Sequence, residues 1–170
     1  MLLRLNILFF IIWFLTFNTS CFSQRTSEWE VLQSPTSELL RKLYFVDSNN
    51  GWATGLSGTI IHTTDAGSSW TLQNSNETSP IVDVFFINKN LGWAITYRDT
   101  PPFGTTILKT TNSGQTWVSE NYPFPQKFMS CIYFTDELTG WIGGNGIAKT
   151  TDGGVTWQEC LIDSGGYSNY

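Results

Sequence analysis

The chain repeats one eight-residue signature three times, and this signature decides the fold. It reads Thr63-Thr64-Asp65-Ala66-Gly67-Ser68-Ser69-Trp70, then Thr110-Thr111-Asn112-Ser113-Gly114-Gln115-Thr116-Trp117, then Thr150-Thr151-Asp152-Gly153-Gly154-Val155-Thr156-Trp157. The three closing tryptophans are 47 and 40 residues apart, and Trp29 lies 41 residues before the first of them. Self-similarity at such a period indicates a repeat architecture in which each unit is one supersecondary motif.

Two further landmarks recur in phase with the signature. One is a Gly-Trp pair (51–52, 92–93 and 140–141), and the other is a phenylalanine seven residues before each of those tryptophans, namely Phe45, Phe86 and Phe134. Each unit resolves into four short strands: an apolar run (43–46, 84–87, 132–135), a strand that opens at Gly-Trp, a third strand (59–62, 106–109, 146–149) and a fourth that starts at the signature tryptophan. The apolar runs are typical of strands covered on both faces. Repeated four-stranded antiparallel units of this length predict β-propeller blades.

The signature residues have a structural logic. An Asp or Asn oxygen can hold a tight turn by accepting backbone N–H groups, and glycine supplies a positive φ without steric cost. The tryptophan buries a large ring, and its N–H needs a partner. Because Asn112 stands where the other copies have an acid, we interpret the acids as scaffold. The residues assigned to this structural role are Thr63, Asp65, Gly67, Trp70, Thr110, Asn112, Gly114, Trp117, Thr150, Asp152, Gly154 and Trp157.

The signature resembles the Asp-box (BNR) repeat. The wider unit, with its Phe, Gly-Trp and Asp-Gly-Gly-x-Thr-Trp landmarks, resembles the photosystem II assembly and stability factor family of propellers from about Trp29 to Trp157. That resemblance implies a non-enzymatic scaffold that binds protein partners, among them a membrane-complex subunit. Asp boxes also occur in sialidases, xyloglucanases and sortilin-type receptors, so a carbohydrate-active or sugar-binding propeller is the alternative.

We therefore expect an all-β chain of about three blades that form an incomplete propeller, because closed propellers need about four to eight blades. The repeat units span about 29–69, 70–116 and 117–156, and a further unit starts at 157–170. The segment around Trp29 aligns with the fourth strand of a blade. Open faces on the terminal blades, among them those that bear Phe45 and Phe134, predict self-association.

The N-terminus predicts export. Arg4 precedes an apolar run from Leu5 to Leu15 that has signal-peptide length and is too short for an ordinary membrane span. We expect a signal peptide over residues 1–23 and a mature propeller segment over 24–170. A lipoprotein anchored through Cys21 is the second interpretation of this segment.

The composition and the residue counts disfavour nucleic-acid binding and most kinds of catalytic site. The net charge is −5 and no basic run occurs, which disfavours nucleic acid as a partner. The single histidine, His62, takes the repeat position of Lys109 and Lys149, where we expect a solvent-facing side chain. We predict no catalytic residues, no metal and no cofactor, and we expect Cys131 and Cys160 to stay unpaired because their strands are not neighbours in a four-stranded meander.

One unit departs from the repeat. Between Trp93 and Asn112 lie extra residues, centred on Tyr97-Arg98-Asp99-Thr100-Pro101-Pro102-Phe103-Gly104. In an antiparallel meander this loop shares a face with the loop that leads to the next blade, which holds Asn121-Tyr122-Pro123-Phe124-Pro125. Insertions on one face of a repeat protein often mark its binding face. The predicted partner surface comprises Tyr97, Arg98, Phe103, Tyr122 and Phe124.

Overall fold

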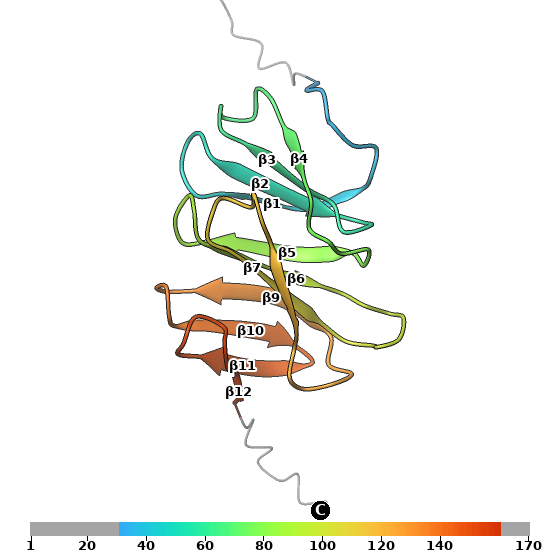
Figure 1. Cartoon of the computed structure of the whole chain (residues 1–170), viewed down its shortest axis with the longest axis vertical. Helices are drawn as coiled ribbons and strands as arrows, with labels where there is room; N and C mark the ends of the chain where they lie inside the picture. The colour runs from blue at the N-terminus through green and yellow to red at the C-terminus, as the bar shows by residue number, and fades with distance from the viewer. Residues whose placement is uncertain (1–30, 161–170) are drawn as a thin grey trace, which may run out of the picture. The chain divides into compact units, whose positions relative to one another are not determined.

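The computed structural model describes residues 31–160, and these residues form twelve β-strands and no helix (Figure 1). Each run of four strands makes one antiparallel sheet. The first blade holds β1 (Leu40–Phe45), β2 (Gly51–Gly55), β3 (Ile60–Thr63) and β4 (Thr71–Gln73). The second holds β5 (Ile81–Phe86), β6 (Gly92–Thr96), β7 (Thr106–Thr110) and β8 (Val118–Asn121). The third holds β9 (Met129–Phe134), β10 (Gly140–Gly144), β11 (Gly146–Thr150) and β12 (Gln158–Glu159).

Within residues 31–160 the strand order of each sheet is that of a simple meander, so the predicted all-β blade architecture is confirmed. The second blade lies between the other two (Figure 1). Three blades are fewer than the roughly four to eight of closed propellers, which agrees with the predicted incomplete propeller. The predicted signal segment, Trp29 and the start of a further unit after Cys160 lie outside the described residues.

Flat stacking of a phenylalanine on a tryptophan joins consecutive blades. The ring of Phe86 stacks on Trp52 of the first blade with centroids 3.5 Å apart, and the ring of Phe134 stacks on Trp93 of the second blade at 3.6 Å. All four rings are buried in the two hydrophobic clusters at the blade junctions. The two landmarks that recur in the sequence are therefore the two halves of one inter-blade contact.

The same phenylalanine also explains the glycine of each Gly-Trp pair. In the second blade, Gly92 pairs directly with Phe86 across β5 and β6. A Cβ at Gly92 would lie 2.5 Å from the Phe86 ring, so any side chain there would displace the ring from its stack. Glycine at this position is thus a packing requirement of the blade junction.

The first strand of each blade begins about three residues before the predicted apolar run. In the first two blades the register shifts between Leu40 and Lys42 and between Ile81 and Asp83, as a β-bulge does. The bulge interrupts the alternation of apolar and polar residues and conceals the start of the strand in the sequence.

Burial on both faces holds for only some of the predicted apolar runs. Side chains of β5 are largely buried, whereas Leu43 on β1 is 58% exposed and Tyr133 on β9 is 57% exposed. The second blade has a neighbouring blade on both sides, whereas the first and third blades each have one neighbouring blade among the described residues. The prediction of two covered faces was therefore wrong for β1 and in part for β9.

Cys131 and Cys160 are exposed and unpaired, as predicted. In residues 31–160 there is no helix that could serve as a transmembrane span.

Candidate functional site

The three signature turns share one hydrogen-bond pattern. In the first, the Thr63 hydroxyl donates to Asp65 Oδ1 over 2.7 Å and accepts the Gly67 N–H over 3.0 Å. Asp65 Oδ1 also accepts the N–H of Ser69, and Asp65 Oδ2 accepts the Ser69 hydroxyl. Thr110, Asn112 and Gly114 repeat the first two bonds in the second turn, and Thr150, Asp152 and Gly154 repeat them in the third. These bonds close the turn that joins the third strand to the fourth.

The signature acids are held as carboxylates. Hydrogen bonds from the Ser69 hydroxyl and N–H lower the pKa of Asp65 to about 2, and those from Thr156 lower the pKa of Asp152 to about 2. In the second turn Asn112 accepts the Thr116 N–H over 3.0 Å and donates to the Thr116 hydroxyl. An amide therefore makes the same contacts, and proton transfer is not what this position requires.

Two of the three signature tryptophans close their own turn. Trp70 donates to the carbonyl of Gly67 and Trp157 to that of Gly154, both over 3.1 Å. The N–H of Trp117 has no acceptor among residues 31–160, although its ring is buried against Phe86. Trp117 therefore contributes a buried ring but no indole hydrogen bond within the described residues.

His62 does not occupy the solvent-facing position that the repeat predicts. Its ring stacks on Trp52 with centroids 4.4 Å apart and planes 13° apart. Burial lowers the pKa of His62, and its Nε2 has no partner among the described residues. Lys109 and Lys149 place their ammonium groups over Trp93 and Trp141 in the same way, so this repeat position covers the landmark tryptophan.

No group of three or more His, Cys, Asp or Glu side chains in residues 31–160 could hold a metal ion.

The extra loop of the second blade is folded back on itself. Arg98 and Gly104 exchange both backbone hydrogen bonds, at 2.9 and 3.0 Å, and close the loop tip between β6 and β7. Gly104 has a φ of +127°, which glycine adopts readily and other residues rarely adopt. The loop is therefore a defined hairpin extension, in which Phe103 directly precedes the closing residue Gly104.

The two predicted loops converge on the same face of the molecule. The Arg98 guanidinium donates to Asn121 Oδ1 over 2.9 Å, and the Tyr97 ring stacks on Phe128 with centroids 4.7 Å apart. Thr105 Oγ1 accepts the N–H of Met129 over 2.8 Å, which ties the base of the first loop to the first strand of the third blade. We call the residues 97–104 and 121–128 the two-loop surface.

The members of the two-loop surface differ in exposure. Tyr97 is 42% and Phe103 is 47% exposed, whereas Phe124 is half-buried. Tyr122 is only 4% exposed, because its ring packs between Phe124 and Trp157. The inclusion of Tyr122 among contact residues is thus corrected: it supports the surface from beneath, and burial raises the pKa of its hydroxyl to about 12.

Sequence reasoning missed two members of this surface. Phe128 carries the stacked Tyr97 ring, and Lys127 forms an ion pair with Glu159 while its ammonium lies 5.9 Å from the Phe124 ring centroid. Both lie just before β9, which begins earlier than the apolar run of 132–135 indicates. The stack of Phe128 on Tyr97 and the ion pair of Lys127 with Glu159 of β12 have no counterpart in the repeat pattern.

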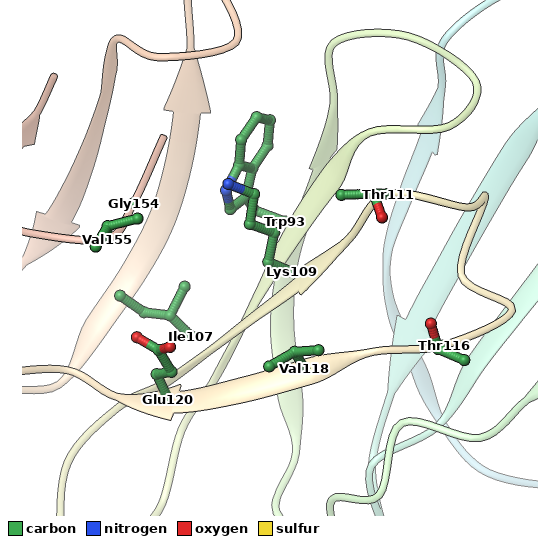
Figure 2. Close-up of a pocket in the computed structure, with 9 residues that line it drawn as sticks. All are labelled: Trp93, Ile107, Lys109, Thr111, Thr116, Val118, Glu120, Gly154 and Val155. Atoms are coloured by element: carbon green, nitrogen blue, oxygen red, sulfur yellow. The ribbon is translucent and has the colours of Figure 1, made fainter. Parts of the chain in front are cut away.

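A groove of about 250 Å³ lies between the second and third blades (Figure 2). Its walls include Trp93, Ile107 and Lys109 of the second blade and Val155 of the third signature turn, and Glu120 lies at its β8 side. Lys109 Nζ donates to the carbonyl of Gly153 over 2.8 Å. The groove thus has mainly apolar walls and one carboxylate, and it pairs no second acid with Glu120.

The repeat explains why this groove exists. At the junction of the first two blades, Gln73 takes the position that Glu120 takes in the next blade. Gln73 Nε2 donates to the carbonyl of Ser113 over 2.7 Å, and its side chain fills the junction. A carboxylate cannot donate a hydrogen bond, so Glu120 does not bind the Gly153 carbonyl, which accepts from Lys109 instead. The space beside Glu120 therefore stays open.

The family model described as photosynthesis system II assembly factor YCF48 matches residues 22–122. The chain belongs to this family. Photosystem II assembly protein Ycf48 of Thermosynechococcus vestitus is 36% identical over 42 residues, which are 25% of this chain and 12% of that protein.

Solved structures show the same fold. A structure titled YCF48 bound to D1 peptide superposes with a TM-score of 0.66 and 26% identity over 77% of this chain and 42% of that one. An ancestral GH74 enzyme superposes with a TM-score of 0.60 and 19% identity over 71% of this chain and 18% of that one, and at this identity the likeness concerns the fold alone. The chain thus spans less than half the length of these proteins.

Proposed function

We propose that this chain is an exported, non-enzymatic propeller scaffold that binds a protein partner, a subunit of a membrane complex, on the two-loop surface. Family membership supports the class of function, because one solved YCF48 is bound to a D1 peptide. The observation that carries the proposal is the convergence of the loops 97–104 and 121–128, tied by Arg98 to Asn121 and by Tyr97 to Phe128.

The chemistry of the two-loop surface suits a protein partner. Exposed aromatic rings and arginine are the residue types that dominate binding energies at protein interfaces. Tyr97 and Phe103 are large apolar side chains that stay partly in solvent although they sit on a tightly bonded loop. A loop that is already ordered loses little conformational entropy on binding, so these rings are well placed as anchors.

Capture from detergent-solubilised membranes tests this proposal. The immobilised wild-type chain should retain a membrane-complex subunit, and a variant with Tyr97→Ala, Arg98→Ala, Phe103→Ala and Phe124→Ala should lose it at least tenfold. Leu138→Ala is the matched control, because Leu138 is also exposed but lies in the β9–β10 turn, on the opposite loop face. Equal capture by the quadruple variant, with an unchanged far-ultraviolet spectrum, would show that the surface is elsewhere.

A further inference from the structure

The junction between the second and third blades is open where the junction between the first and second blades is closed. Gln73 fills the closed junction, and Glu120 takes its repeat position beside the groove of Figure 2. All the residues that line this groove belong to the second and third blades. The groove therefore does not involve the outer faces of the first and third blades.

The rims of the two junctions also differ in polarity. Val118 on β8 and Val155 in the third signature turn line the groove, and they are 64% and 68% exposed. At the closed junction, the same two repeat positions hold the polar residues Thr71 and Gln115. Exposed apolar side chains that gather around one groove, with a few polar groups beside them, are typical of a binding site.

The groove carries a carboxylate without a cationic partner. Neither of the two ion pairs among the described residues includes Glu120. Lys109, which also lines the groove, donates instead to the carbonyl of Gly153. Lys109 pairs with Val118 across β7 and β8, and Glu120 lies two residues further along β8. A ligand is therefore best matched by a cation beside Glu120 and an apolar group beside Val118.

β8 is also a free edge of its sheet. It is the end strand of the second blade, and all four of its residues are exposed. The N–H of Tyr122 donates to the carbonyl of Thr105, so Glu120 and Val118 also direct their backbone groups toward β7. Ser119 lies between them and directs its N–H and C=O away from β7, where no described group bonds them. Such an edge can pair with an added strand.

We propose that this groove binds an extended segment of a partner protein, which adds to β8 as an antiparallel strand. The antiparallel direction continues the pairing of the blade, and antiparallel pairs are the more stable kind. Ser119 exchanges both backbone hydrogen bonds with one residue of the segment. The residues on either side of that one face Glu120 and Val118 at the closer, non-hydrogen-bonded spacing.

The side chains of the groove define the sequence of this segment. The residue that faces Glu120 is lysine or arginine, because opposite charges directly across two strands stabilise their pairing. The residue that faces Val118 is apolar and extends over the groove between Val118 and Val155. Because the segment runs antiparallel to β8, it carries the basic residue first and the apolar residue two positions later.

Fluorescence anisotropy with the purified chain tests the proposal. The probe is a labelled synthetic peptide of threonines with lysine, threonine and valine at its centre. We expect saturable binding to the wild type, and Glu120→Lys should weaken it roughly tenfold because like charges then face each other. The same variant should bind a peptide with glutamate in place of lysine better than the wild type does. Glu38→Lys is the matched control, since Glu38 is an exposed acid of the first blade, and it should bind like the wild type.

N-methylation of the peptide separates strand addition from the capture of side chains alone. The threonine between lysine and valine faces Ser119 and donates to its carbonyl, so a methyl group on that nitrogen should abolish binding. No saturable binding, equal losses in Glu120→Lys and Glu38→Lys, or equal binding of the methylated peptide would each overturn the proposal. So would self-association of the wild type that Glu120→Lys removes, because a second copy would then cover β8. Glu120 lies outside the two-loop surface, so these results leave the capture experiment unaffected.

Discussion

Lys42 Nζ of the first blade lies 2.9 Å from Asp83 Oδ1 of the second. The other oxygen of Asp83 accepts the N–H of Ile132, in the third blade, over 2.9 Å. One buried carboxylate near the start of β5 therefore contacts all three blades through their first strands. This connects neighbouring blades independently of the tryptophan and phenylalanine stacks.

Asp83→Ala should lower the free energy of unfolding by about 1 to 3 kcal/mol, because it leaves the Ile132 N–H buried without its acceptor. Lys42→Ala should cost less than about 1 kcal/mol, since the Lys42 side chain is 43% exposed and its ion pair is partly screened. Urea unfolding of the two variants provides the comparison. Equal losses would contradict the bridging role of Asp83.

The signature acids predict a loss of stability in acid. The pKa of Asp65 and Asp152 is about 2 in the folded chain, below the ordinary 3.8, so their contribution is present above about pH 4 and is lost as the pH falls towards 2. A variant with Asp65→Asn and Asp152→Asn should fold, because Asn112 already makes the equivalent bonds. Its melting temperature should fall less between pH 4 and pH 2 than that of the wild type. Parallel declines in circular dichroism melts would contradict this assignment.

Trp93→Phe should destabilise the chain more than Trp117→Phe does. Both rings are buried, but only the Trp93 N–H has an acceptor among the described residues, the Gly153 carbonyl. The difference between the two variants should be about 1 kcal/mol, the usual net contribution of one hydrogen bond. Thermal unfolding measures it, and a Trp117 variant that is at least as unstable would show that the indole bond contributes little.

We expect no glycosidase activity in spite of the fold shared with a GH74 enzyme. Asp65 and Asp152 are occupied as turn acceptors, and Glu120 faces its groove without a second acid in the lining. Fluorogenic sialosides and xyloglucan oligosaccharides are the substrates to use. Turnover that disappears in Glu120→Gln would make the groove of Figure 2 an active site and would refute the expectation.

Most of the fold could be predicted because its landmarks repeat. The stack of Phe86 on Trp52 and the bonds of Asp65 depend on local spacing, and the sequence repeats that spacing in each unit. The bulge after Leu40 could not be predicted, since it breaks the alternation that reveals a strand. The half-buried position of His62 was hidden as well, because the lysines at the equivalent positions suggest a solvent-facing side chain.

The convergence of the two loops could be predicted from the sequence, but the contacts that orient their side chains could not. Loop lengths and meander geometry bring 97–104 and 121–128 to one face, and the Arg98–Asn121 bond shows that contact. The orientation of each ring depends on residues of the following repeat unit. Tyr122 packs against Trp157, and Tyr97 stacks on Phe128. Such contacts join residues from different units and leave no periodic signal in the sequence.

The most direct test of partner binding is site-specific photo-crosslinking in solubilised membranes. A photoreactive phenylalanine analogue replaces the exposed Phe103 of the two-loop surface in one sample and the exposed Leu138 of the β9–β10 turn in the other. We predict a crosslink to a membrane-complex subunit from position 103 and little or none from position 138. Comparable crosslinks from both positions, or a crosslink from position 138 alone, would contradict the claim that this surface binds the partner.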